Sequence, residues 1–157
     1  MIKIRKANCK DGQAVSELLK SKYSYITKEE AVSVFEYECM YQHYRIAHNG
    51  DKVVGIISWR TQGTEKHGVA ELTKITVLQD ISESEEVKEM LFDVMVAEAD
   101  YFYKKHNSKL RKVFSMIHTD NIQIKNFFEN KGMHQEAILK NHFHAGKDEL
   151  VFSLFFN

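Results

Sequence analysis

Strand-like and helix-like segments alternate along almost the whole chain, and this alternation constrains the fold more than any other feature. The 157 residues read in order as a strand, two helices, three strands, a helix, a strand, a helix and two strands. Such an order predicts an α/β fold with a mixed central sheet rather than a helical bundle. The length suits a single domain over residues 1–157 that buries a core of its own.

The strands are predicted from runs of β-branched and aromatic residues that alternate with polar ones. They are expected at Ile2–Lys6, Tyr44–His48, Lys52–Trp59, Val69–Val77, Lys112–Ile117, Ala137–Phe143 and Glu149–Phe155. Asn49-Gly50 indicates a hairpin turn between the second and third of these strands.

The helices are predicted from apolar residues at helical spacing, with capping residues at their ends. The expected caps are Asp11, Thr27 with Glu30, Ser82 with Glu85, and Thr119 or Asp120, with Gly132 as a left-handed stop. The long helix after the fourth strand has an apolar stripe, which we place at Val87, Met90, Leu91, Val94 and Tyr101.

The composition excludes several classes of function. The 22 basic residues balance the 22 acidic ones, so no net field favours nucleic acid or a membrane surface. No apolar run could span a bilayer and no signal peptide is recognised, so we expect a cytoplasmic protein. Cys9 and Cys39 lie beside apolar helical positions and are expected to be buried free thiols. His134, His142 and His144 lack further ligands at metal spacing, so no metal is expected.

The segment Ala70–Leu91 reads as a strand, a short loop and the start of a helix. A helix start of this kind is a common anchor for a phosphate group, because its backbone N–H groups have no partner within the helix. Here the loop carries Ser82, Glu83, Ser84, Glu85 and Glu86. Two interpretations stay open: a helix start capped by its own side chains, or a phosphate site that uses backbone N–H groups.

The order of elements and several motifs together resemble the GNAT superfamily of N-acetyltransferases over nearly the whole chain. On the fourth strand, Glu71, Leu72, Ile75 and Val77 follow the family's spacing. The resemblance implies a GNAT-like sheet of about seven mostly antiparallel strands flanked by about four helices. It also implies acetyl-CoA as co-substrate, with its pantetheine arm paired to the backbone of Ile75, Thr76 and Val77.

The family's phosphate loop, R/Q-x-x-G-x-G/A, is altered in this chain. Its arginine position falls on Ser82, and its glycine positions fall on Glu83, Glu85 and Val87, with Ser84 between them. The acidic side chains would repel a pyrophosphate, although salt screens exposed charges. Backbone donors do not depend on residue type, so the resemblance still implies cofactor contacts from this loop.

The resemblance also suggests the catalytic groups. Glu71 occupies the position of the family's strand glutamate, and simple alternation places it on one face with Thr73 and Val77. An apolar environment disfavours the charged form of a carboxylate, which suits a general base. His118, at the end of the following strand, is the substitute candidate for acid or base.

A second family motif covers Asn121 to Met133, with Asn121, Phe127, Glu129 and Gly132 in matching positions. The motif's usual acid, a tyrosine, is replaced by Phe128, which has no hydroxyl and could only line the cofactor. Asn121 could contact the cofactor arm or could simply cap the helix.

The resemblance thus predicts a GNAT-type enzyme, an acyl-CoA-dependent N-acyltransferase that moves an acetyl group to an amine of a small molecule or peptide. Homodimers are common in such a family. The alternative is a GNAT-fold ligand-binding or protein-interaction module with weak or no CoA binding. A third interpretation is an acyltransferase with another donor. The aromatic residues that could line an acceptor site are Tyr23, Tyr25, Tyr37, Tyr41 and Tyr44.

Overall fold

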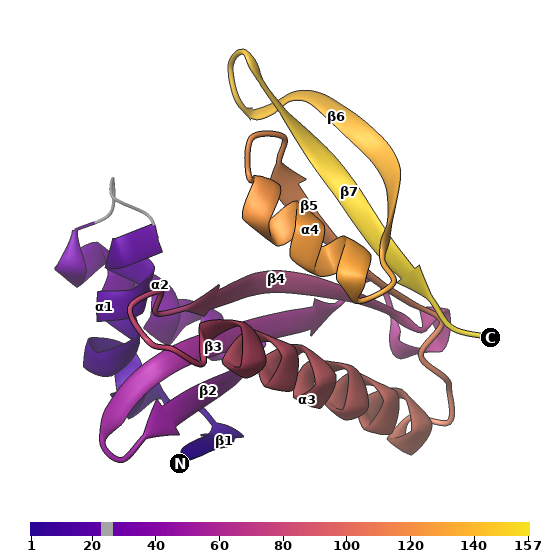
Figure 1. Ribbon diagram of the computed structural model, residues 1–157. Helices are drawn as coiled ribbons and strands as arrows, with labels where there is room; N and C mark the ends of the chain where they lie inside the picture. Colours follow the sequence, from indigo (N-terminus) through magenta and orange to yellow (C-terminus); the bar gives the residue numbers. More distant parts are fainter. Residues whose placement is uncertain (23–26) are drawn as a thin grey trace. The chain divides into compact units, whose positions relative to one another are not determined.

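The computed structural model describes residues 1–22 and 27–157 (Figure 1). Its strands are β1 (Ile2–Lys6), β2 (His43–Asn49), β3 (Lys52–Thr61), β4 (Val69–Val77), β5 (Lys112–His118), β6 (His134–His144) and β7 (Lys147–Phe155). Its helices are α1 (Gly12–Lys22), α2 (Lys28–Glu38), α3 (Ser84–Lys105) and α4 (Ile122–Asn130), with short 3-10 turns at Cys9–Asp11 and Glu65–His67.

The strand order is β1-β2-β3-β4-β5-β7-β6. β4 and β5 are parallel, whereas β1–β2, β2–β3, β5–β7 and β6–β7 are antiparallel. Within the described residues, seven strands and four α-helices therefore confirm the predicted α/β fold with a mostly antiparallel sheet.

The chain forms two compact units. Unit 1 comprises Met1–Arg60 with Thr73–Glu98, and unit 2 comprises Thr61–Leu72 with Ala99–Asn157. Strand β4 and helix α3 contribute to both, since each is divided between the two units.

In unit 1, helices cover both faces of the β2–β3 hairpin. One core cluster joins apolar residues of α1 and α2 to alternate strand residues such as Ile46 and Ile56. Gly55 points to the opposite face, because a Cβ placed there would lie 3.0 Å from Leu91 and 3.3 Å from Val87 of α3. Successive strand residues face opposite sides of a sheet, so α1 and α2 pack on one face and α3 on the other.

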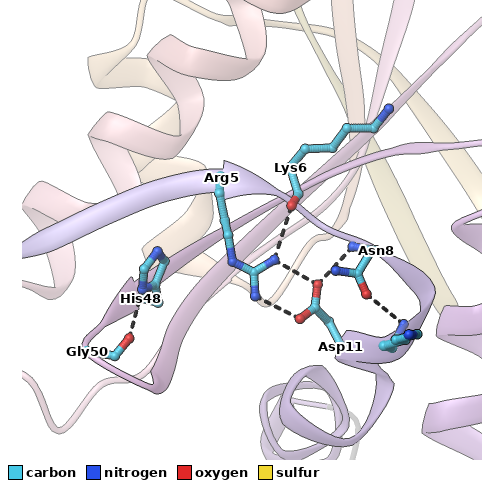
Figure 2. A network of polar contacts seen from close by, with 7 residues as sticks. Arg5, Lys6, Asn8, Asp11, His48 and Gly50 are labelled. Atoms are coloured by element: carbon cyan, nitrogen blue, oxygen red, sulfur yellow. Dashed lines mark hydrogen bonds and ion pairs between the residues drawn. The ribbon is translucent and has the colours of Figure 1, made fainter.

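The start of α1 is organised by Asn8 and Asp11 rather than by Asp11 alone. The Asn8 side chain accepts from the Lys10 N–H, and the Asp11 carboxylate accepts from the Asn8 N–H in return, at 2.8 Å each. Arg5 of β1 donates through both terminal nitrogens to the same carboxylate, at 2.9 and 2.7 Å, as Figure 2 shows. The capping box thus belongs to the 3-10 turn that leads into α1, where Asn8 is the cap and Asp11, the predicted cap of the helix, is the returning member.

Strand β4 departs from simple alternation between Thr73 and Lys74. The Thr73 hydroxyl lies 2.7 Å from the Ser58 hydroxyl and donates to Gln42 at 2.6 Å. The next residue, Lys74, donates to Glu38 at the end of α2 at 2.9 and 2.7 Å. Adjacent side chains of a regular strand point to opposite faces, yet these two reach the same α2 side.

Farther along β4, Val77 lies against the α3 face, 3.1 Å from the Cβ position of Gly55. Thr73 and Val77 therefore do not share a face, which corrects the alternation predicted for Glu71, Thr73 and Val77. An irregularity of this kind re-aims side chains and twists a strand, and such irregularities often lie next to functional sites.

In unit 2, β5, β7 and β6 are joined by antiparallel pairing, and α4 packs on one face. Phe128 of α4 is fully buried and lies 6.1 Å, ring to ring, from Phe152 of β7. The chain leaves α4 through Gly132, whose φ of 81° confirms the predicted left-handed stop. The helix begins one or two residues later than predicted, because Asn121 and not Thr119 or Asp120 is its cap.

Three further predictions need correction. Tyr101 is 68% exposed and Tyr103 is fully buried, so the stripe of α3 continues in steps of four from Val87 rather than through Tyr101. The β2–β3 turn lies at Gly50-Asp51, with Asn49 still in the strand. The two thiols are not both buried, because Cys9 is exposed and Cys39 is half-buried.

No helix among the described residues combines the length and the apolar character needed to cross a membrane.

Candidate functional site

In unit 1, the candidate cofactor residues follow the irregularity of β4. Ile75 and Thr76 are half-buried and Val77 is buried at the end of the strand. The Leu78 N–H donates to the Val54 carbonyl at 2.9 Å, so this end of β4 is tied to β3. The loop from Gln79 to Glu83 then leads into α3.

The start of α3 differs from the predicted capping box of Ser82 and Glu85. The helix begins at Ser84, and the Val87 N–H donates to the Glu83 carbonyl at 2.9 Å, so Glu83 takes the cap position. The Glu85 carboxylate instead accepts from Lys88 at 2.6 Å. A helix start two residues later moves the available backbone donors along the chain by the same amount.

The donors that remain at this helix start belong to Glu85 and Glu86. The Ser84 N–H reaches the Ile81 carbonyl at 3.3 Å, whereas no backbone acceptor for Glu85 or Glu86 lies in the described part of the chain. The first N–H groups of a helix are directed outward and favour an anion. Val87, in contrast, is fully buried and its N–H is already bonded, so it can contribute packing only.

The charge at the helix start is acidic. Glu83, Glu85 and Glu86 are all exposed, and Lys88 forms an ion pair with Glu85. Over residues 1–22 and 27–157, neither Glu83 nor Glu86 takes part in an ion pair. These two carboxylates therefore repel an anion that the backbone N–H groups would attract. Salt would screen this repulsion.

A polar network fixes β4 beside this segment. The Glu38 carboxylate accepts from Lys74 and from the Tyr44 hydroxyl, and its side chain is only 15% exposed. Together with the Thr73–Gln42 hydrogen bond, the Glu38 carboxylate joins β4 to the end of α2 and to β2. The irregular backbone of β4 is thus held by side chains that are themselves half-buried, which favours a single conformation.

Tyr37 and Tyr41 lie near this network but project outward. They are 66% and 48% exposed and their rings meet edge to face, 5.0 Å between centroids. Tyr44 is buried and belongs to the core. Tyr23 and Tyr25, the remaining aromatic candidates, lie outside the described residues.

In unit 2, Glu71 is a buried carboxylate on β4, with 5% of its surface exposed. It lies opposite Phe114 of β5 in the parallel register, and it accepts a hydrogen bond from the Gln62 side-chain amide. Tyr103 and Ser115 fix the strand on either side through bonds to the Val69 and Leu72 carbonyls. Glu71 therefore lies in a rigid setting, with the Gln62 amide as one of its partners.

His118 ends β5 and lies directly opposite Glu149 of β7. The His118 Nδ1 atom is 3.7 Å from the Glu149 Oε1 atom, and the side chains are 42% and 4% exposed. A second imidazole, His144 of β6, stacks on His118 with ring centroids 5.6 Å apart. Sequence reasoning selected His118 but missed Glu149, because the register between strands distant in sequence decides which residues meet.

Asn121 and Phe128 have structural roles in unit 2. The Asn121 side-chain oxygen accepts from the Ile124 N–H at 3.3 Å, which is the capping alternative of the two that the sequence left open. Its side-chain NH₂ remains as a possible donor to a ligand. Phe128 occupies the family's tyrosine position and is fully buried among aromatic rings.

The described residues contain no group of three or more metal-ligating side chains. The candidate residues accordingly fall into two sets: the Ile75–Val87 segment of unit 1, and Glu71, His118, Asn121 and Phe128 of unit 2. The first offers backbone donors, and the second offers a buried carboxylate and a partly exposed imidazole.

The sequence matches no known family model and no curated protein. The fold, in contrast, matches solved structures over nearly its whole length. A protein from Desulfovibrio desulfuricans assigned to the GNAT family of acetyltransferases is 20% identical, with a TM-score of 0.80 and 99% of each chain covered. A GNAT-family acetyltransferase from Bacillus cereus is 16% identical, with a TM-score of 0.73 and 100% of this chain and 99% of that chain covered.

The aminoglycoside 6′-N-acetyltransferase from Enterococcus faecium is 14% identical, with a TM-score of 0.75 and 98% of this chain and 96% of that chain covered. These matches share one architecture and little sequence. The chain therefore has the fold of the GNAT-family acetyltransferases, as the order of elements and the motifs predicted.

Proposed function

We propose that this protein is an acyl-CoA-dependent N-acyltransferase that moves an acetyl group from acetyl-CoA to an amine of a small molecule or peptide. The observation that carries the proposal is the irregularity of β4 at Thr73–Lys74, which lies just before Ile75–Val77 and is fixed by a network of hydrogen bonds. In a chain with the GNAT fold, the extended pantetheine arm of acetyl-CoA would pair with the backbone of Ile75–Val77.

The pyrophosphate of the co-substrate would be bound by backbone rather than by side chains. The N–H groups of Glu85 and Glu86 are the donors at the start of α3. The loop has neither glycines nor an arginine, so we expect binding that is weak and sensitive to salt.

The chemistry needs one proton to leave the acceptor and one to reach the leaving group. The amine nitrogen attacks the thioester carbonyl, the new C–N bond forms, and the C–S bond breaks to release the CoA thiolate. Glu71 is the proposed base, since it is buried and lies on a part of β4 that Tyr103 and Ser115 hold in place. Phe128 cannot protonate the thiolate, so His118 is the proposed acid.

A second function has specific support from the acidic helix start and from Phe128. The acidic helix start lacks the glycines and the arginine that would favour CoA. Phe128 lacks the hydroxyl that would protonate the CoA thiolate. A GNAT-fold module that binds another ligand, or another protein, would need neither group. It predicts no acyl transfer and at most weak CoA binding.

Calorimetric titration with acetyl-CoA separates the two functions. We expect measurable binding to the wild-type protein, and about three- to tenfold tighter binding when Glu83 and Glu86 are both replaced by glutamine, with the gain lost at high salt. Glu89→Gln, at an exposed position one turn further along α3, is the matched control and should change little. No binding by either form at millimolar acetyl-CoA would refute the enzyme proposal.

The role of Glu71 is tested by Glu71→Gln. This variant should transfer the acetyl group at least about a hundredfold more slowly, the usual contribution of a general base, with acetyl-CoA affinity retained. An unchanged rate would remove Glu71 from the mechanism.

A further inference from the structure

Glu149 is a buried carboxylate whose position no folding role accounts for. Its side chain is 4% exposed, and its Oε2 atom has no hydrogen-bond partner among the described residues. Burial of a carboxylate without donors is costly, and buried polar groups in native proteins are almost always satisfied. Such a residue is expected to have a partner in the working protein.

The nearest candidate partner is also unsatisfied. His118 Nδ1 is buried and, like Glu149 Oε2, has no hydrogen-bond partner within the described part of the chain. It lies 3.7 Å from Glu149 Oε1. A charge-assisted N–H···O bond is about 2.8 Å long, so closure needs a movement of about 1 Å, within reach of side-chain rotation.

The two residues are held in register by the sheet. His118 and Glu149 are directly opposite each other on the antiparallel strands β5 and β7, so their side chains project from the same face. That face is opposite α4, because Phe152, three residues beyond Glu149 on β7, is the residue that meets Phe128 of α4. The pairing thus belongs to unit 2 alone and does not depend on a loop.

The geometry also favours one nitrogen of His118 as the site of the proton. Nδ1 is the buried atom that faces the carboxylate, whereas the side chain as a whole is 42% exposed. A hydrogen bond from Nδ1 to a carboxylate holds the proton there and leaves the Nε2 lone pair as a base. The His144 ring, stacked on His118 at 29°, restricts rotation of the imidazole.

We propose that Glu149 and His118 form a carboxylate–imidazole pair, in which Glu149 is the positioning residue and His118 Nε2 exchanges a proton with the reacting groups. The pair rests on the proposed acyl transfer: Nε2 takes up the proton that Glu71 has removed from the amine, and the imidazolium gives it to the departing CoA thiolate. Proton, acyl group and electron pairs balance without a further reactant.

The remaining charges around His118 do not compete with Glu149. From β6, the group that faces His118 is His144. Asp148, next to Glu149 on β7, is turned away and engaged, since it accepts from Lys140 at 2.8 Å and from the Asn141 N–H at 3.1 Å. Asp148 is therefore a matched control: a carboxylate one residue away that does not meet the imidazole.

The pairing is tested by ¹⁵N-edited NMR of the histidine rings in the full chain, with His118→Gln used for assignment. In the wild type, His118 should be the Nδ1–H tautomer. In Glu149→Leu, which removes the acceptor at similar volume, it should revert to the Nε2–H tautomer that histidine favours in water. Asp148→Asn should leave the ring signals unchanged. An Nε2–H tautomer in the wild type, or no change in Glu149→Leu, would overturn the pairing.

The proton transfer is tested by the kinetics of CoA release from acetyl-CoA with a panel of amines. His118→Gln should lower kcat by about a hundredfold or more, and Glu149→Leu should lose most of the same factor, with the KM for acetyl-CoA unchanged. Glu149→Gln, which keeps a neutral acceptor, should fall between the wild type and Glu149→Leu. A wild-type rate in Glu149→Leu would overturn the positioning role.

The two proposals fail in distinguishable ways. If the wild type neither binds acetyl-CoA nor transfers its acetyl group, the proposed function is refuted and proton exchange during acyl transfer is refuted with it. The NMR result would still decide whether Glu149 holds the His118 proton, because it requires neither acetyl-CoA nor activity.

Discussion

Glu98 accepts hydrogen bonds from a charged and a neutral side chain in unit 1, and its neutralisation provides a quantitative test of the structure. Its carboxylate accepts from Arg45 at 2.7 Å and from the Trp59 indole N–H at 3.1 Å, and its side chain is 16% exposed. Burial raises the pKa of the Glu98 carboxyl, but these two hydrogen bonds outweigh it, so that the pKa lies below the usual 4.5. The perturbation is Glu98→Gln, which keeps the shape and removes the charge.

The size of the effect follows from what is lost. A hydrogen bond to a charged group contributes about 1.5–3 kcal/mol, and glutamine retains only the weaker, neutral part. We expect Glu98→Gln to lower the free energy of unfolding by about 2 kcal/mol at pH 7. For a chain of this length, that corresponds to a fall in Tm of about 4–8 °C.

The assay is urea unfolding followed by the fluorescence of Trp59, the single tryptophan of the chain, and by circular dichroism. Glu89→Gln is the matched control, because Glu89 is a glutamate of the same helix, α3, and its side chain is exposed. It should change the unfolding free energy by less than about 0.5 kcal/mol.

The pH dependence is specific to this explanation. A carboxyl whose pKa is lower in the folded protein contributes stability above its unfolded pKa, near 4.5, and this contribution is lost as the pH falls through the folded value. The difference between wild type and Glu98→Gln should therefore shrink below pH 4.5. A difference that stays constant to pH 3, or a Glu98→Gln variant as stable as Glu89→Gln at pH 7, would refute the reasoning.

Three further outcomes are expected. The His43 ring stacks on Trp59 with centroids 4.1 Å apart, and burial lowers the pKa of His43. The protonated imidazole should quench the fluorescence of Trp59, with a midpoint below pH 6.5. This quenching should vanish in His43→Phe. Burial, with a hydrogen bond to Cys9, raises the pKa of Cys39 to about 11. At pH 8 only about a thousandth of Cys39 is therefore thiolate. Alkylation of the protein, mapped by mass spectrometry, should favour Cys9. Asn121→Ala should lower the unfolding free energy by about 1 kcal/mol in urea titrations, because α4 loses its cap; no loss would contradict that role.

Local chemistry explains which features the sequence could predict. Thr27 and Glu30 form the predicted capping box, and Gly132 adopts the predicted left-handed conformation. Both depend on residues within one turn of each other. The predicted range of β4, Val69–Val77, was correct for the same reason, since β-branched and alternating residues define it locally.

Helix starts were less predictable where several polar residues compete. Near α1, α3 and α4 the sequence has more than one candidate cap within four residues. In each case the helical segment begins earlier or later than the predicted cap implies. The choice depends on tertiary contacts and on competing side-chain pairs, such as the bond from Lys88 that removes Glu85 from a capping role.

The sequence by itself therefore determined the class of fold, the order of its elements and the family that it resembles, because periodicity and capping act over short distances along the chain. Only the tertiary structure decided that β4 is irregular at Thr73–Lys74, that backbone donors of Glu85 and Glu86 remain at the α3 start, and that Glu149 faces His118. These features depend on strand register and on packing between residues far apart in sequence. No local pattern encodes such contacts, since each partner is selected by the fold as a whole.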